Sequence, residues 1–186
     1  MAVLDYYRGT GHSPDLSTVE KIGAAVDALP DAEVVLDIEL AMAWLGQQEF
    51  ATEKTALLGF CIGGAFAIQA CATTGKPACA ISYYGQLRNP KKPIDPITLA
   101  PELNAPLLLH IGERDRLITN TDVNQFRDAA QRSPAPIEVH TYPGAPHAFD
   151  EWHRPAVFRP IASSEAWQRT LTFLEWHLTH HQRKHA

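Results

Sequence analysis

The segment KTALLGFCIGGAFAIQA, residues 54–70, joins a short apolar run, one cysteine and a pair of glycines. The run TALLGF, residues 55–60, is typical of a strand buried in a parallel sheet. The small residues from Ile62 to about Thr73 predict a helix directly after it. Cys61 therefore lies at a turn between a strand and a helix, where a thiol is either a nucleophile or a small core residue.

Before this segment, the sequence predicts one strand and two helices. AVLDYY, residues 2–7, is a short apolar run that ends at the turn-rich stretch RGTGHSPD. Ser17 and Glu20 form a capping-box pattern, which predicts a helix that stops by Pro30. Apolar residues at helical spacing predict a second helix within residues 31–48.

After the segment, buried strands and helices alternate. Strands are predicted within 78–85, 106–115 and 137–143, and helices from Thr121 to about Gln131 and within 163–178. A long irregular loop rich in proline is expected over residues 143–163. This alternation predicts an α/β fold in which helices cover a parallel sheet. Because ligands bind at the carboxyl ends of such strands, functional residues are expected just after them.

The composition narrows the class of protein. With 186 residues, of which 45% are hydrophobic, the sequence predicts one domain over residues 1–186. The net charge of −5 and the scattered Lys and Arg give no basic field for nucleic acid. No apolar run approaches the roughly 20 residues that span a membrane, and the N-terminus does not resemble a signal peptide. The three cysteines fit free thiols in a reducing cytosol, so we expect a cytoplasmic protein.

The turn at Cys61 has the pattern of a nucleophile elbow. Gly59, Cys61 and Gly63 form G-x-C-x-G, which Gly64 extends, with cysteine in the place of the usual serine. The glycines leave room for the strand and helix to pack closely, and the helix N-terminus favours a thiolate. The amide of Ile62 is expected to point into the site and to donate to an oxyanion. The alternative is a buried cysteine in a glycine-rich turn.

A thiol nucleophile needs a base, and the base needs an acid to orient it. An elbow predicts the chain order nucleophile, acid, histidine. Asp115 follows one predicted strand and His147 follows the next, so both lie where functional residues are expected. Taken singly, they could be an ordinary turn aspartate and a loop histidine. Glu113 and Asp122 are weaker candidates for the acid.

The segments GFCIGGAFA, YYG, HIGERD and YPGAPHAF resemble the dienelactone hydrolase family of the α/β-hydrolase fold. The resemblance runs from Ala2 to about the last helix, and the cysteine is its specific part, since most α/β-hydrolases use serine. It implies that Cys61 is the nucleophile, Asp115 the orienting acid and His147 the base. It also implies hydrolysis of a small ester or lactone through an acyl-enzyme, without a cofactor. The reaction that names the family converts a dienelactone to maleylacetate.

The resemblance also bears on substrate binding. Arg8 matches a family arginine that helps to bind the substrate carboxylate, although a solvated loop arginine is an alternative. The family's second such arginine lies four residues after the histidine, where this chain has Glu151, which would repel an anionic substrate. Arg154 and Arg159 are the candidates to replace it. Tyr84, at the end of a predicted strand, is expected either to line the pocket or to pack in the core.

The chain is N-terminally short relative to the fold it resembles. In that fold, three strands precede the one that residues 2–7 resemble, and the last of them adjoins the elbow strand. The loop after it supplies the second oxyanion amide and a glutamate that interacts with the resting cysteine. We expect either a piece of a longer reading frame, which we favour, or a natural short form with a rebuilt or inactive site.

Three other interpretations stay open at this point. An inactive chain could bind a partner through an exposed sheet edge. A thiol redox protein is less favoured, because no second cysteine lies at C-x-x-C spacing from Cys61. His177, His181 and His185 have the spacing of a helical metal site, but a solvated tail is the favoured interpretation.

Overall fold

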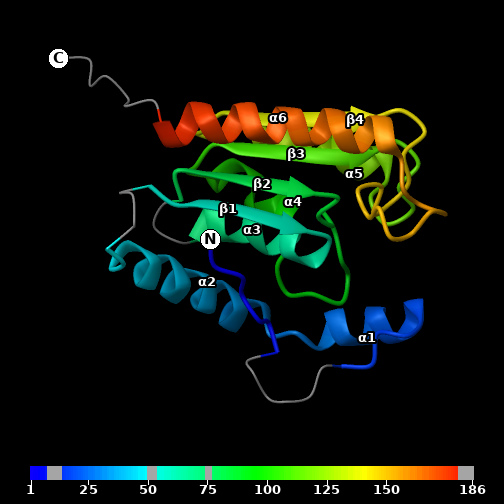
Figure 1. Ribbon diagram of the computed structural model, residues 1–186, viewed down its shortest axis with the longest axis horizontal. Coiled ribbons are helices and arrows are strands. Elements are labelled where there is room, and N and C mark those ends of the chain that lie inside the picture. Colours follow the sequence, from blue (N-terminus) through cyan, green and yellow to red (C-terminus); the bar gives the residue numbers. More distant parts are fainter. Residues whose placement is uncertain (8–13, 50–53, 74–76, 180–186) are drawn as a thin grey trace.

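The computed structural model describes residues 1–7, 14–49, 54–73 and 77–179. Four strands form a parallel sheet in the order β1-β2-β3-β4. Their bounds are Ala56–Phe60 for β1, Cys79–Tyr83 for β2, Leu107–Gly112 for β3 and Ile137–Tyr142 for β4. The predicted parallel sheet is therefore confirmed, and the carboxyl ends of all four strands meet at one edge (Figure 1).

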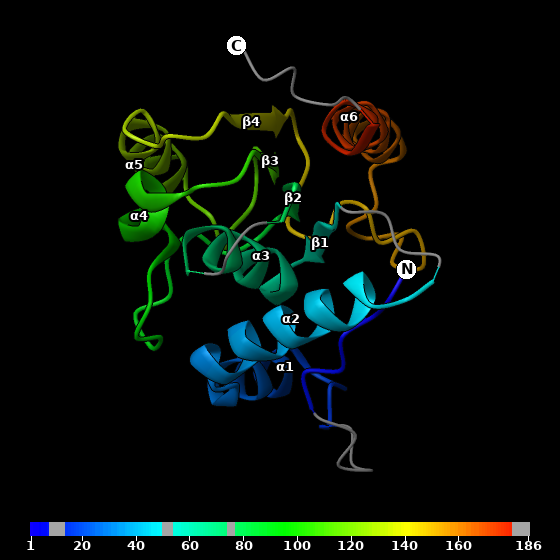
Figure 2. The ribbon, with the colours of Figure 1, turned by 90° about the vertical axis from the view of Figure 1, so that its left-hand side faces the viewer.

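Helices cover both faces of this sheet, as predicted (Figure 2). The helix α6 lies on one face, and α3, α4 and α5 lie on the other, with α1 and α2 outside α3. Their bounds are Val19–Ala28 for α1, Asp31–Gly46 for α2, Ile62–Thr73 for α3, Pro96–Leu99 for α4, Asn120–Ala130 for α5 and Pro160–Thr179 for α6. A single 3₁₀ turn, Ala100–Glu102, follows α4. The elbow segment thus forms β1 and α3.

A buried polar chain ties α6 to the sheet. The His110 ring contacts the Tyr142 hydroxyl through Nδ1 at 2.8 Å and the Thr170 hydroxyl through Nε2 at 2.9 Å. The Tyr83 hydroxyl lies 2.9 Å from the same Thr170 oxygen. Burial lowers the pKa of His110 to about 3, so the imidazole is neutral and serves as a hydrogen-bonding group. These contacts join β2, β3 and β4 to the helix above them.

The predicted strand over residues 2–7 is wrong. The chain there has no regular secondary structure and ends in a turn at Tyr6 and Tyr7. Leu4, Tyr6 and Tyr7 pack instead on a cluster formed mainly by side chains of α2 and α3. A strand requires a hydrogen-bonded neighbour, and in the described ranges β1 pairs only with β2. The segment is therefore attached to the fold by partial burial of these side chains rather than by strand pairing.

Two helix caps lie near the predicted residues, but not on them. The cap of α1 is Thr18 rather than Ser17, and its hydroxyl accepts from the backbone N–H three residues on. The cap of α5 is Thr119 rather than Thr121, and Asp122 completes a capping box with it. In both cases a nearby hydroxyl residue accepts the hydrogen bond from the first turn of the helix. The cap is hard to predict because several hydroxyl residues lie near each helix start.

The predicted loop over residues 143–163 is also too long. The helix α6 begins at Pro160, where a ring without an N–H costs the first turn nothing. The short helix α4 was not predicted, since four residues carry no helical periodicity. It too begins with a proline, Pro96.

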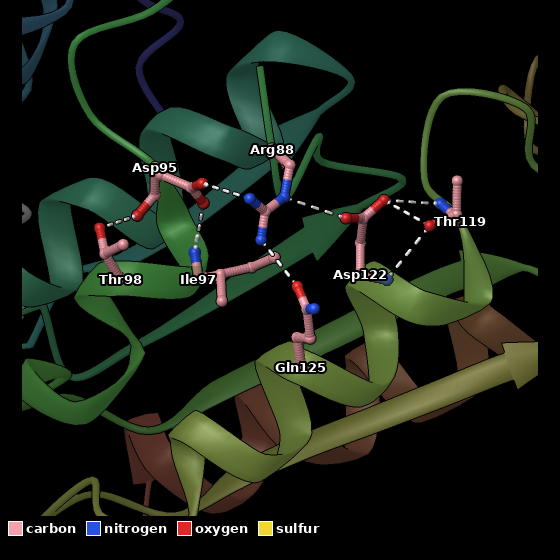
Figure 3. A network of polar contacts seen from close by, with 7 residues as sticks. All are labelled: Arg88, Asp95, Ile97, Thr98, Thr119, Asp122 and Gln125. Atoms are coloured by element: carbon pink, nitrogen blue, oxygen red, sulfur yellow. Dashed lines mark hydrogen bonds and ion pairs between the residues drawn. The ribbon is translucent and has the colours of Figure 1, made fainter. Parts of the chain in front are cut away.

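An ion-pair network fixes the segment after β2 to the start of α5 (Figure 3). Arg88 donates to Asp122 at 3.2 Å and to Gln125 at 2.7 Å, and its guanidinium lies 3.7 Å from Asp95. Asp95 in turn caps α4 through the backbone N–H of Ile97. Because the Arg88 side chain is half exposed, each pair contributes little on its own, and the network acts mainly by orientation.

Candidate active site

The turn between β1 and α3 has the geometry that the glycine pattern predicts. Cys61 has a φ of 52°, a left-handed conformation that is uncommon for a residue with a side chain. Its N–H donates to the Tyr83 carbonyl at 2.9 Å, and its carbonyl accepts from Gly64 at 3.0 Å. The helix starts at Ile62, whose N–H is among the first-turn amides that have no partner within a helix. The turn thus presents a thiol and free amides at one helix end.

Three predicted residues come together at the carboxyl edge of the sheet. His147 Nε2 lies 3.3 Å from Cys61 Sγ, and His147 Nδ1 lies 2.8 Å from Asp115 Oδ2. The other carboxylate oxygen, Oδ1, accepts from the backbone N–H groups of Leu117 and Ile118 at 2.8 and 3.2 Å. The Asp115 side chain is fully buried. A continuous hydrogen-bonded chain therefore runs from the thiol through the imidazole to an anchored carboxylate.

The pKa of His147 is set by opposing effects. Burial is the largest single effect and lowers it, but the hydrogen bonds to Asp115 and Cys61 and the charges of both groups outweigh burial. Together they raise the pKa of His147 to about 9. At neutral pH the ring is therefore mostly an imidazolium, placed between a carboxylate and a sulfur atom. This arrangement places a positively charged ring nitrogen 3.3 Å from Cys61 Sγ.

We expect the ring resonances of His147 to titrate near pH 9, whereas those of His110 stay constant from pH 5 to pH 9. The folded-state pKa of His147 lies above its unfolded value of about 6.5. Its contribution to stability is therefore complete below about pH 6.5 and is lost as the pH rises through about 9. NMR titration and urea unfolding across this interval measure both effects.

The control for this prediction is Asp115→Asn, which keeps the side-chain shape and removes the charge. In this variant the pKa of His147 should move back toward its ordinary value, and stability should fall less between pH 6.5 and 9. An unchanged titration of His147 in the variant would contradict the assignment of Asp115 as its partner.

The side chain of Tyr84 lies beside that of His147. It is buried, with a φ of 41°, and its ring meets the His147 ring edge-on at 5.2 Å and the Phe149 ring at 5.5 Å. Burial, followed by the negative charges of Asp150, Glu151 and Cys61, raises the pKa of Tyr84. Tyr84 therefore packs in the core, which is one of its two expected roles, and its ring lies beside that of His147.

A second tyrosine at the site, Tyr6, was missed by the sequence analysis. A Cβ added to Gly63 would lie 2.4 Å from the Tyr6 hydroxyl oxygen, so this hydroxyl rests against the first turn of α3. Its ring lies 5.5 Å from that of Phe66. The only sequence signal was its place in DYYRG, two residues before Arg8, and that segment was interpreted as a strand.

The other acidic and basic candidates lie elsewhere or pair with one another. Glu113 accepts from the Gly144 amide at 2.8 Å, so it anchors a turn. Glu151 pairs with Arg154 at 2.7 Å, and Arg159 donates to backbone carbonyls of its own loop. Both arginines are therefore paired within their own loop. Arg8 lies outside the described residues.

The remaining cysteines differ from Cys61 in their surroundings. Cys71 and Cys79 are fully buried, and burial raises the pKa of each to about 12, which makes them unreactive. Within the described ranges, no group of three or more His, Cys, Asp or Glu side chains is arranged to hold a metal ion. His181 and His185 lie outside those ranges. Among the helices described, none is both long and apolar enough to cross a membrane.

Known proteins share this sequence and fold. A protein from Bradyrhizobium sp, named "Probable 2-oxo-3-(5-oxofuran-2-ylidene)propanoate lactonase", is 38% identical over 172 residues, which are 89% of this chain and 68% of that protein. The Carboxymethylenebutenolidase of Rhodococcus opacus is 30% identical over 188 residues, covering 96% of this chain and 71% of its own. The chain spans 68% and 71% of the length of these two relatives, and 57% of the length of a "Putative carboxymethylenebutenolidase" from Escherichia coli (strain K12).

Solved structures give the same result. A crystal structure from Klebsiella pneumoniae, named "Putative Dienelactone Hydrolase", superimposes with a TM-score of 0.74 at 29% identity and covers 83% of this chain and 64% of that one. An esterase from Pyrococcus furiosus, at 18% identity and a TM-score of 0.62, shares the fold. The model of the Dienelactone hydrolase family matches residues 2–178. The chain therefore belongs to the dienelactone hydrolase family and has an α/β-hydrolase fold.

Proposed function

We propose that this chain hydrolyses small esters or lactones through an acyl-enzyme formed on Cys61. The observation that carries the proposal is the hydrogen-bonded chain from Cys61 through His147 to Asp115. It lies at an elbow turn and at the carboxyl edge of a parallel sheet, where such folds bind ligands. The names of the relatives, a lactonase and a carboxymethylenebutenolidase, point to the same reaction class.

The distances support a role for each residue of the chain. The imidazolium of His147 holds the thiolate of Cys61, which attacks the carbonyl carbon of the substrate. The oxyanion that forms accepts a hydrogen bond from the Ile62 amide. His147 then gives its proton to the leaving oxygen. In the second step the neutral imidazole takes a proton from the water that cleaves the thioester. Asp115 keeps the ring oriented through both steps.

Tyr84 and Arg8 are the residues proposed to contact the substrate. Tyr84 is assigned to the pocket wall because its ring touches that of His147. Arg8 is assigned to a substrate carboxylate on family resemblance alone. The negative charges of Asp150 and Glu151 raise the pKa of Tyr84. We therefore expect uncharged acyl groups to be accepted at least as well as anionic ones.

Mass spectrometry during turnover of an activated acetate ester tests this function. We expect one acetyl group on the intact protein, which is lost when the ester is exhausted. All three cysteines lie on one tryptic peptide, so fragmentation must place the group on Cys61 rather than on Cys71 or Cys79. The buried pair provides an internal control. No adduct, or an adduct on lysine only, would leave the chain as a binding protein of this fold.

A further inference from the structure

The hydroxyl group of Tyr6 lies against the helix end that carries the nucleophile. A Cβ built on Gly63 would be 2.4 Å from the Tyr6 oxygen and 3.6 Å from the ring carbon that bears it. The hydroxyl, rather than the ring, is therefore the part that approaches the helix. Gly63 is the second residue of α3, directly after Ile62 and two residues after Cys61. Because a Cβ bond tilts toward the helix N-terminus, the hydroxyl lies beside the first turn of α3, on the side nearer Ile62 and Cys61.

The Tyr6 side chain is held in this place by its ring. The ring lies 5.5 Å from the Phe66 ring at an interplanar angle of 59°. It packs with a cluster that includes Leu29, Val34 and Ile38 from the α1–α2 region. A tyrosine fixed through its ring has few ways to move its hydroxyl, since only two side-chain torsions place it. The hydroxyl is thus positioned before any substrate binds.

The electrostatics agree with this placement. Burial raises the pKa of Tyr6, and the negative charge of Cys61 raises it further. The hydroxyl therefore keeps its proton at neutral pH and is available as a hydrogen-bond donor. The neighbouring Tyr7 instead responds to burial and to Asp5.

An acyl-transfer site of this type needs donors for the oxyanion, and the elbow supplies one of them through the Ile62 amide. We propose that the Tyr6 hydroxyl is a second oxyanion donor. The inference rests on the proposed function, because an oxyanion forms only if Cys61 attacks a carbonyl. It assigns a catalytic role to a side chain from the N-terminal segment, residues 1–7.

The acylation step balances with this assignment. Cys61 Sγ gives an electron pair to the carbonyl carbon, and the π pair of the carbonyl moves onto its oxygen. The Ile62 N–H and the Tyr6 O–H donate to this oxyanion and stabilise it. When the oxyanion collapses, the bond to the leaving oxygen breaks and His147 supplies the proton that this oxygen takes up. Tyr6 keeps its own proton throughout.

The test is Tyr6→Phe, which removes one oxygen atom and keeps the ring on Phe66, with Tyr7→Phe as the matched control. We expect kcat/KM for an activated ester to fall by about 10²-fold in Tyr6→Phe and to stay within about twofold in Tyr7→Phe. The second readout is alkylation of Cys61 by iodoacetamide, a displacement at saturated carbon that forms no oxyanion. Its rate should be unchanged in both variants, and so should the midpoint of thermal unfolding.

Each result separates one explanation from another. If Tyr6→Phe is acylated as fast as the wild type, the oxyanion role is wrong while the hydrolase function stands. A parallel loss of acylation and alkylation overturns the role as well, because Tyr6 would then act on the thiolate itself. If the wild-type chain forms no acyl adduct, both proposals fail.

A second variant applies if Tyr6→Phe does not fold. Incorporation of 3,5-difluorotyrosine at position 6 keeps the ring and the hydroxyl, but that hydroxyl loses its proton at a lower pH. Acylation should then fall at a pH where the wild type is still fully active, whereas alkylation should not. A pH profile identical to that of the wild type would contradict the proposal.

Discussion

Replacement of Cys61 by alanine is expected to lower ester turnover by at least about 10⁴-fold, because removal of a nucleophile eliminates the covalent path. Without Sγ no thioester forms, and the imidazole of His147 has only water to activate. The fold should persist, since alanine meets the same left-handed φ of 52° with a smaller side chain. Initial rates with an activated aryl ester and the midpoint of thermal unfolding measure the two consequences separately.

Cys71→Ala is the matched control for this prediction. Cys71 is a fully buried thiol on α3, the helix that begins at the elbow, and it takes no part in the hydrogen-bonded chain. The control should keep its turnover and lose some stability, because truncation leaves a small void in a packed core. Undiminished hydrolysis by Cys61→Ala would assign the chemistry to another group. Equal losses in both variants would point to a structural cause.

The sequence allowed prediction of those parts of the site that depend on local structure. A strand, a G-x-C-x-G turn and a helix follow each other within residues 54–73, so the backbone of the elbow depends on neighbours in the sequence. Asp115 and His147 were found because parallel strands end at one edge of the sheet. Residues that follow different strands therefore meet there, although many residues separate them in the chain.

Features that depend on distant packing were not predicted correctly. Residues 2–7 have a composition that suits a strand, but the adoption of a strand depends on a partner that local sequence does not specify. The same segment carries Tyr6. Its ring packs on Phe66, and its hydroxyl fits against α3 because residue 63 is a glycine and has no side chain. No spacing rule links a tyrosine in an irregular segment to a helix that begins more than fifty residues later.

The turn that holds Cys61 should also be sensitive to added volume, and Gly59→Ala tests this. A Cβ at Gly59 would lie 2.0 Å from the Gly63 carbonyl oxygen and 2.6 Å from the Gly64 nitrogen. These are backbone atoms of α3, so no side-chain rotation can relieve the overlap, and β1 and α3 must separate. We expect a loss of stability of about 3 kcal/mol or more, at or above the usual cost of overpacking.

Gly23→Ala is the control for this prediction, because it adds the same methyl group where there is room. Gly23 lies within α1, and a Cβ there would have nothing within 4 Å. Alanine is the better helix former, so this variant should gain about 0.5–1 kcal/mol. Urea unfolding should thus shift in opposite directions for the two substitutions. In any Gly59→Ala protein that remains folded, displacement of α3 should move Cys61 away from His147 and slow acylation. If Gly59→Ala instead unfolded at the same urea concentration as the wild type, the close contact between strand and helix would be wrong, and with it the reason for glycine before this cysteine.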